Sequence, residues 1–437
     1  MSKKERILGP VGKAISGIHL PHLKDTENCE TIVMPVPKEV RIPLSQHIGA
    51  PAKPLVKKDD KVFVGTLIAA AGGFVSAPVH SSVSGTVTAV TDTHIIISSD
   101  GEQTVAEDLA PFPVKTAKDI AAAADACGLV GLGGAGFPSK VKLTLKDDTI
   151  IDTLVINATE CEPYITTDCR ECLESYDDVI GGAYLLKEVM NIPNVVICVE
   201  SNKAAAIEKL YEIATDERDV NDAVKLMKVP TRYPQGAEKV VIYSATGRKV
   251  PLGKLPSDVG CIVMNITTVS TLYRFIKIGM PLVSKRVTVD GTAVKEPKNV
   301  LVPIGTPIKD LLEFVGGIDE DANEIMMGGP MMGVDVCSED AVVEKRNNAI
   351  TVMKQPLKPQ KQTACINCAR CVGACPMKLY PSRVEAALNH NLYENLNKLN
   401  VNYCMECGSC AYVCPAKRPL TQVMRLAKTV LRRESNK

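Results

Sequence analysis

Two cysteine runs near the C-terminus constrain this chain more than any other feature. The run C-x2-C-x2-C-x3-C-P begins at Cys365 and repeats without deviation from Cys404. This is the spacing with which bacterial two-cluster ferredoxins hold [4Fe–4S] clusters, and there the fourth cysteine of each run ligates the other cluster. Zinc is disfavoured because it prefers two separated C-x2-C knuckles. The predicted ligand sets are Cys365, Cys368, Cys371 and Cys414 for one cluster, and Cys375, Cys404, Cys407 and Cys410 for the other.

Composition is that of a globular protein with several domains. The 437 residues are 45% hydrophobic and 23% charged, enough for two to four cores. Lys and Arg (51) nearly balance Asp and Glu (50), so overall charge favours neither a nucleic acid nor a membrane surface as partner. Sixteen cysteines in so long a chain favour metal ligation in a reducing cytosol over a disulfide scaffold. No apolar run approaches the ~18–20 residues of a membrane-spanning helix.

The pattern of residue types changes several times along the chain. Residues up to about 114 are rich in β-branched alternation, proline and glycine, and the segment 57–90 has the pattern of a biotinyl/lipoyl-type hammerhead without the carrier lysine at its turn. Strand and helix patterns then alternate, which favours a parallel sheet, and a smaller α+β module follows. Apolar residues at helical spacing separate the two cysteine runs. The predicted limits are 1–114 (β-rich), 115–280 (α/β), 281–344 (small module), 345–363 (linker) and 364–437 (cysteine-rich).

A glycine-rich loop and several polar loops mark the α/β region. Five glycines lie within residues 128–137, and such a loop lets backbone amides approach a phosphate or a ring system. The loop follows a helix, so it is not a Rossmann fingerprint, and by itself a structural turn explains it equally well. The loop 157–164, however, follows an apolar strand and carries two glutamates. Ligands bind at that end of strands in open α/β sheets, and 233–239 and 263–268 repeat the pattern.

Together these segments resemble a known family. GLGGAGFP, NATECEPY, YPQGAEK and VMNITT are similar, in this order, to the flavin-binding subunit of respiratory complex I. With the hammerhead, an SLBB-like β-grasp module and the cysteine runs, nearly the whole chain resembles the RnfC/RsxC family of the Rnf (ion-translocating ferredoxin:NAD oxidoreductase) complex. The implied fold class is multidomain α/β. Its expected parts are a barrel-sandwich hybrid, a Rossmann-like FMN domain, an SLBB module and an α-helical ferredoxin domain.

The resemblance also implies roles for individual residues. Three positions depart from the flavin protein of complex I: Leu132 stands for an Arg, Thr159 for an Asp, and Ala237 for the first of two paired glutamates, which removes charge near the flavin. No acid–base residue is required for hydride transfer, so none is expected. The residues implied to hold FMN are Gly131, Gly133, Gly134, Gly136, Lys142, Asn157, Glu160, Gly236, Asn265 and Thr268. Those implied to contact NADH are Phe137, Glu162 and Glu238.

The function implied by the resemblance is electron transfer between NADH and partner subunits. FMN exchanges a hydride with NAD(H), and the two clusters relay single electrons. The chain would lie peripherally at the cytoplasmic side of the inner membrane, bound through other Rnf subunits, especially an iron–sulfur one. Two alternatives stay open: a soluble flavin-dependent NADH reductase or bifurcating subunit, and a non-enzymatic iron–sulfur adaptor.

Three smaller features have two explanations each. Cys169-x2-Cys172 is more simply a pair of buried thiols than a third metal site. The histidines of the β-rich part favour structural hydrogen bonding over metal ligation. The basic residues after Cys414 are either a solvated helix face or a docking surface for an acidic partner or an anionic leaflet.

Overall fold

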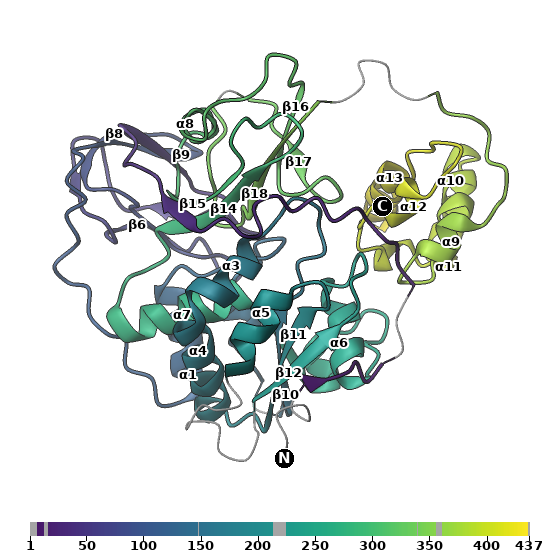
Figure 1. Cartoon of the computed structure of the whole chain (residues 1–437), viewed down its shortest axis with the longest axis horizontal. Helices are drawn as coiled ribbons and strands as arrows, with labels where there is room; N and C mark the ends of the chain where they lie inside the picture. Colours follow the sequence, from purple (N-terminus) through teal and green to yellow (C-terminus); the bar gives the residue numbers. More distant parts are fainter. Residues whose placement is uncertain are drawn as a thin grey trace.

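The computed structural model describes residues 7–12, 16–146, 148–212, 224–338, 340–354 and 361–435. Within them lie sheets of five, six, four and three strands and a separate cluster of helices. The α/β sheet lies at the bottom of Figure 1, with the other two β regions above it and the cysteine-rich helices to one side. No helix in these ranges combines the length and the apolar character needed to cross a membrane.

The N-terminal β region is a sandwich of two small antiparallel sheets. Alternating residues such as Val40, Ile42, Ile95 and Ile97 fill the space between them, as the period-2 pattern predicts. The first sheet has the order β3 (Glu39–Pro43), β9 (His94–Ser99), β8 (Gly85–Val90) and β5 (Lys61–Val62). The second has the order β4 (Lys53–Pro54), β6 (Leu67–Ala70) and β7 (Val79–His80).

The α/β domain is built on a parallel sheet that is buried on both faces. Leu154 and Ile156 of β10 face the helical layer of α1, α4 and α7, whereas Val155 faces α6. Continuous apolar strands are the pattern expected for such a sheet. The sheet order is β1 (Ile7–Leu8), β12 (Val224–Val229), β11 (Asn194–Glu200), β10 (Thr153–Ala158) and β13 (Cys261–Asn265). The helices are α1 (Ala117–Ala126), α2 (Ser139–Leu143), α3 (Thr167–Glu174), α4 (Tyr176–Val189), α5 (Ala204–Leu210), α6 (Glu238–Thr246), η3 (Pro256–Val259) and α7 (Ile266–Ile278).

The strand order of this sheet fixes where a ligand can bind. From β10 the chain moves outward to β11 and then β12, and it returns to the other side of β10 with β13. The direction of winding therefore reverses between β10 and β13. In doubly wound folds the crevice beyond the carboxyl ends of two such strands is the usual ligand site.

The third region is a mixed sheet with one helix packed on it. The cluster of Val287, Val289, Val300, Leu311 and Ile350 forms its core. The sheet order is β17 (Val334–Asp335), β16 (Glu324–Met327), β18 (Ala349–Met353), β14 (Ser284–Asp290), β15 (Lys298–Pro303) and β2 (Thr31–Val33), and the helix is α8 (Ile308–Phe314).

Three strands lie outside the limits expected from the sequence. Strand β1 joins the α/β sheet and β2 joins the mixed sheet, although both come from the segment 1–114. Strand β18 lies within the expected linker 345–363, where it pairs with β14 and β16. Short strands of this kind are stabilised by distant partners and leave little local signal, whether they lie at the edge of a sheet, as β1 and β2 do, or within it, as β18 does. Residues 355–360 of that expected linker lie outside the described residues.

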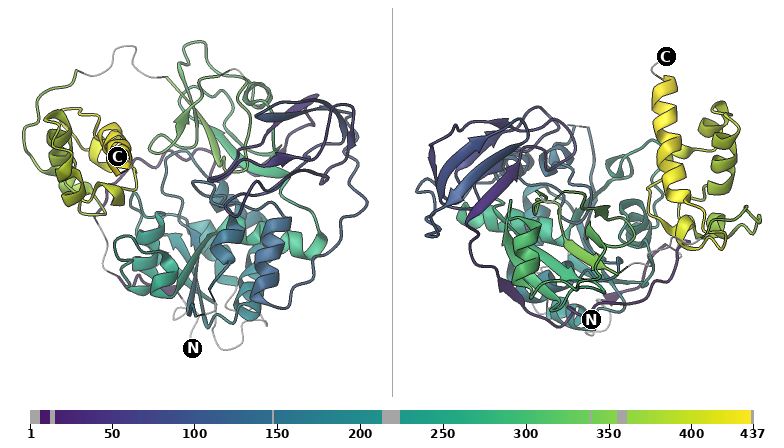
Figure 2. Two further views of the ribbon diagram at one scale, coloured as in Figure 1. Left: turned by 180° about the vertical axis from the view of Figure 1, so that it is seen from behind. Right: turned by 90° about the horizontal axis from the view of Figure 1, so that it is seen from above.

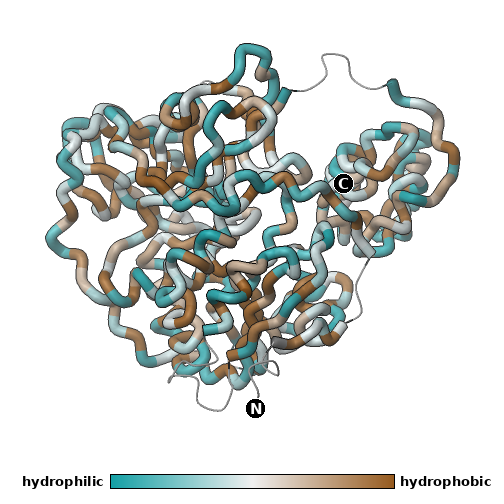
Figure 3. Tube along the Cα trace, in the orientation of Figure 1, coloured by the Kyte–Doolittle hydropathy of each residue, from teal (hydrophilic) through white to brown (hydrophobic). Residues whose placement is uncertain are grey.

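The cysteine-rich domain is helical, as predicted. Its long terminal helix stands at the edge of the molecule (Figure 2), and its inner face contributes Met424, Ala427 and Leu431 to a small core. The strands of the α/β sheet are mostly hydrophobic (brown in Figure 3), whereas hydrophobic and hydrophilic residues are more mixed in these helices. The helices are α9 (Arg370–Ala374), α10 (Pro381–Asn389), α11 (Glu394–Lys398), η4 (Val401–Tyr403), α12 (Ser409–Tyr412) and α13 (Leu420–Ser435).

Candidate functional site

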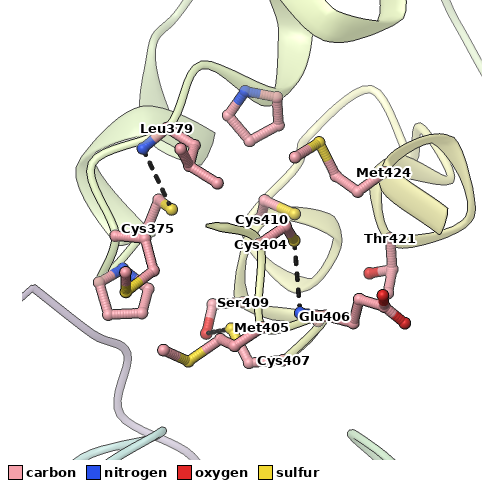
Figure 4. A pocket seen from close by; sticks show the side chains of 14 residues that line it. Cys375, Leu379, Cys404, Met405, Glu406, Cys407, Ser409, Cys410, Thr421 and Met424 are labelled. Carbon is pink, nitrogen blue, oxygen red and sulfur yellow. Dashed lines mark hydrogen bonds between the residues drawn. The ribbon is translucent and has the colours of Figure 1, made fainter. Parts of the chain in front are cut away.

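One pocket of the cysteine-rich domain brings together a complete predicted ligand set. Cys375, from the first run, lies opposite Cys404, Cys407 and Cys410 of the second run across the pocket in Figure 4. Backbone N–H groups donate to two of the sulfurs, Leu379 to Cys375 at 3.4 Å and Glu406 to Cys404 at 3.3 Å. Such amide hydrogen bonds to sulfur are among the features that set cluster potentials.

A second pocket is lined by the other predicted set, Cys365, Cys368, Cys371 and Cys414. The two differ in their surroundings, because Cys365 and Cys368 are exposed whereas Cys407 is buried. Arg418 holds together the chain around this second pocket. Its guanidinium binds Glu385 through two nitrogens and donates to the Thr363 carbonyl at 3.1 Å. The site of Cys365, Cys368, Cys371 and Cys414 therefore faces solvent and is called the outer cluster site. The site of Cys375, Cys404, Cys407 and Cys410 faces the rest of the chain and is called the inner cluster site.

Each pocket is lined by four cysteines, one for each iron of a [4Fe–4S] cluster. Among the described residues, no group of three His, Cys, Asp or Glu could hold one metal ion. In a [4Fe–4S] cubane each cysteine binds a different iron, so the four sulfurs stand farther apart than the ligands of one ion. Burial raises the pKa of Cys404 to about 11 and of Cys410 to about 12. Metal ligation is what holds such thiols as thiolates at neutral pH.

The glycine-rich loop lies at the reversal point of the α/β sheet. The Gly131 N–H donates to the Phe137 carbonyl at 2.9 Å, which closes the loop, and its tip at Gly133 and Gly134 is exposed. The Leu132 N–H donates to Thr268 Oγ1 at 3.1 Å. A Cβ built on Gly133 would lie 2.4 Å from Asn265 Nδ2, whereas one on Gly134 would meet no atom within 4 Å. The loop thus packs tightly on the start of α7 and opens on its other side.

Strand β10 supplies the second wall of the same crevice. Asn157 Nδ2 donates to the Gly236 carbonyl at 2.9 Å, and a Cβ on Gly236 would lie 2.6 Å from the Thr159 carbonyl oxygen. Glu160 is buried, and its Oε1 accepts the Asp168 N–H at 2.8 Å. Its Oε2 has no hydrogen-bond partner among the described residues and stands 3.9 Å from both Lys24 and Lys203.

These features fit FMN as the ligand of the crevice. The exposed tip of the glycine-rich loop has open space beside Gly134, so its backbone can approach a ligand closely, and Asn265 and Thr268 place polar side chains against the loop. The crevice also lies where doubly wound sheets bind nucleotide-like ligands.

The remaining predicted residues have protein partners. Lys142 Nζ donates to Glu238 at 2.8 Å and to the Val263 carbonyl at 3.0 Å, so an implied FMN residue is paired with an implied NADH residue. Glu162 turns to the mixed sheet, where its Oε2 accepts the Met331 N–H at 3.1 Å, and burial raises the pKa of its carboxyl to about 7. Phe137 is half-buried at the end of the glycine-rich loop.

Several buried charged residues near the site were not predicted from the sequence. Lys24 Nζ donates to the carbonyls of Glu160, Glu162 and Ile165 at 2.8, 2.9 and 2.5 Å and so fixes the loop after β10. Glu200 is the last residue of the otherwise apolar strand β11, and a polar residue at that end of a strand is the one local signal that predicts a site residue there. Burial raises its pKa to about 7. A cavity of about 130 Å³ beside this loop is lined by His19, Leu20, Pro21, His22, Lys24, Glu160, Cys161, Glu162, Pro163, Glu200, Asn202, Thr231, Arg232 and Tyr233.

The inner cluster site contacts the α/β domain directly. Tyr233, 2% exposed, donates its hydroxyl to the Cys407 carbonyl at 2.6 Å. Ile18 and Ala374 are buried with it, and Cys161 packs against this group. The cysteine-rich domain therefore docks through a predicted cluster ligand, next to the loop that carries Glu160 and Glu162.

The smaller sequence features have structural explanations. Cys169 and Cys172 are buried on α3, and burial raises the pKa of Cys169 to about 11, which suits inert thiols. His47 Nε2 lies 3.0 Å from the Ala77 N–H and serves packing of the β sandwich. Of the basic residues after Cys414, Arg418, Arg425 and Lys428 pair with Glu385 or Glu406, which favours an internal role for them.

Comparison with known proteins agrees with this architecture. Four family descriptions match in chain order: RnfC barrel sandwich hybrid domain (13–108), Nuo51 FMN-binding domain (124–274), SLBB domain (286–335) and 4Fe-4S dicluster domain (359–415). The predicted fold class is thereby confirmed. The crystal structure of an NAD+-reducing [NiFe]-hydrogenase in the air-oxidized state aligns with a TM-score of 0.48 at 18% identity, over 64% of this chain and 54% of that one.

Fold and domain content define a modular FMN and iron–sulfur protein of the oxidoreductase class. The RnfC-type protein of the proton-translocating ferredoxin:NAD(+) oxidoreductase complex of Clostridium ljungdahlii is 38% identical over 94% of this chain and 93% of its own length. Its counterpart in the Na(+)-translocating complex of Acetobacterium woodii is 37% identical over 94% of this chain and 95% of its own length. The chain belongs to this RnfC family of ion-translocating oxidoreductase complexes.

Proposed function

We propose that this chain is the NADH-reactive electron-transfer subunit of an ion-translocating ferredoxin:NAD+ oxidoreductase. The bound FMN supplies hydride exchange with NAD(H) and one-electron exchange with iron–sulfur clusters. Two [4Fe–4S] clusters held by the cysteine sets would supply one-electron transfer to or from partner subunits of the complex, including an iron–sulfur subunit. The chain is peripheral to the membrane at its cytoplasmic side and is held there by those partners.

The contact between Tyr233 and Cys407 carries the proposal. It joins the loop wall of the flavin crevice to the ligand set of the inner cluster through a buried hydrogen bond. The outer ligand set includes the exposed Cys365 and Cys368, which a partner protein can approach. This arrangement supports a path from FMN to the inner cluster, then to the outer cluster, and then to another subunit.

The chain's own residues have binding and orienting roles in this proposal. Gly131, Gly133, Gly134, Gly136, Asn265 and Thr268 cradle FMN on one side, and Asn157, Glu160 and Gly236 do so on the other. Lys142 and Glu238 bind as a pair at the edge of the crevice. Phe137 and Glu162 border the approach of the dinucleotide. Cys365, Cys368, Cys371 and Cys414 hold the outer cluster, and Cys375, Cys404, Cys407 and Cys410 hold the inner one.

Anaerobic purification followed by flavin and iron analysis tests this function. We expect one FMN and about eight iron per chain, the content of two [4Fe–4S] clusters. Addition of NADH should bleach the flavin absorbance and then reduce the clusters. Iron without flavin, and no bleaching after FMN is added back, would favour an iron–sulfur adaptor. If no membrane protein co-purifies with the chain, a soluble NADH reductase would be favoured.

A further inference from the structure

A buried ammonium from outside the α/β domain reaches the glycine-rich loop. Lys285 lies on β14 of the mixed sheet, and only 2% of it is exposed. Its Nζ donates to the Leu132 carbonyl oxygen at 3.2 Å, while the Leu132 N–H donates to Thr268 Oγ1. Both backbone polar groups of Leu132 are therefore held, one by the mixed sheet and the other by α7.

Asp168 attracts the same ammonium electrostatically and hydrogen-bonds to the start of α7. Its Oδ2 accepts from Asn265 Nδ2 at 2.7 Å, and its Oδ1 accepts from Thr267 Oγ1 at 3.0 Å. Burial lowers the pKa of Lys285 to about 8, and the attraction of Asp168 and Glu171 opposes that shift, while Arg286 adds to it. Burial, together with the charge of Glu160, raises the pKa of Asp168 to about 7. The carboxylates of Asp168 and Glu171 favour the charged form of Lys285, which is enclosed among groups that shape the crevice.

We propose that Lys285 is a positioning residue for the flavin site, which holds the glycine-rich loop against α7 and supplies a buried positive charge to that loop. This inference rests on the proposed function. The loop tip is exposed and packs on one side only, so its placement depends on anchors at its base. A positive charge in a poorly solvated place favours the phosphate of FMN and the negative charge that the cofactor gains on reduction. The α/β domain therefore needs the mixed sheet to complete its crevice.

Substitution of Lys285 in the full chain tests this inference. Lys285→Met removes both the hydrogen bond and the charge, and Lys285→Gln removes the charge but leaves a polar amide for the buried site. Hydrogen bonds to charged groups are strong enough that the FMN dissociation constant should rise about tenfold or more in both variants. The midpoint potential of bound FMN should fall, since the reduced cofactor loses a favourable charge. Lys285→Arg should keep the potential near that of the native protein.

Arg286→Met is the matched control. Arg286 is the next residue of β14 and also a mostly buried cation, but its guanidinium binds Glu171 and Glu174 of α3 rather than the glycine-rich loop. It should weaken the contact between the two domains, but it should change the FMN dissociation constant and the flavin potential much less than Lys285→Met does. Iron content, measured in parallel, should stay at the native level in every variant.

The FMN dissociation constants and flavin potentials of these variants decide whether Lys285 positions the flavin site. If both neutral variants bind FMN within twofold of the native protein and keep its potential, Lys285 has no positioning role. An equal shift in Arg286→Met would assign the effect to domain packing instead. If Lys285→Met does not fold, Lys285→Gln gives the same comparison. Failure of the native protein to bind FMN would overturn both this inference and the proposed function, whereas native binding with unchanged variants overturns this inference alone.

Discussion

Removal of the Tyr233 hydroxyl should loosen the docking of the inner cluster domain. In Tyr233→Phe the ring still fills its buried position, but the Cys407 carbonyl loses its partner at 2.6 Å. A buried carbonyl left unpaired costs about 1–3 kcal/mol. Since 1.4 kcal/mol is about a factor of ten, the equilibrium between docked and undocked domains should shift by roughly 5- to 150-fold toward undocking.

Hydrogen exchange measures this shift directly. Amides that become exchangeable on undocking exchange in proportion to the open population, so those of residues 405–413 should exchange faster by that factor in anaerobic, cluster-loaded protein. Tyr412→Phe is the control, because Tyr412 is 50% exposed on the same domain. Exchange within twofold of native in Tyr233→Phe would refute the reasoning, and so would an equal acceleration in Tyr412→Phe.

Two further predictions concern the outer cluster and the buried acid beside the flavin loops. Cys365→Ser should lose about four of about eight iron and keep FMN, whereas Cys337→Ser, an exposed thiol outside both runs, should lose none; simultaneous loss of FMN would contradict separate sites. The pKa of Glu200 is raised by burial from 4.5 to about 7, so its favourable contribution is present below pH 4.5 and disappears as the pH rises to 7. Glu200→Gln should therefore gain, relative to native, about 3 kcal/mol of stability in the α/β domain between pH 4.5 and pH 8. Thermal unfolding at both pH values checks this, and a pH-independent difference would count against it.

Features encoded by close spacing could be predicted from the sequence. The cysteine runs specify ligand sets because a cubane needs donors at short, regular intervals, and the structure brings each predicted set together around its own pocket. The apolar strand before Asn157 and the polar loop after it indicated a crevice for the same reason. A run of apolar residues and the polar residues that end it are both local properties of the sequence. The role of each crevice residue toward FMN and NADH stays a prediction.

Contacts between distant segments could not be predicted in this way. Strands β1 and β2 consist of two and three residues and exist because strands more than 200 residues away offer them hydrogen bonds. The carboxylate of Glu162, a residue predicted to contact the dinucleotide, also accepts the Met331 N–H of a different domain, a contact that the sequence did not indicate. Such pairs leave no period in the sequence, because each partner is ordinary in its own neighbourhood.

The sequence by itself determined the chemistry of this protein: two cluster-type cysteine runs, a flavin-type set of loops and four kinds of domain. Only the tertiary structure decided how these parts work together, through Tyr233 against Cys407 and through the buried ammonium groups of Lys24 and Lys285 against carbonyls of the flavin loops. The physical reason is burial. A lysine or tyrosine in a sequence is compatible with solvent, and only the folded chain determines which carbonyl must satisfy its donor once water is excluded.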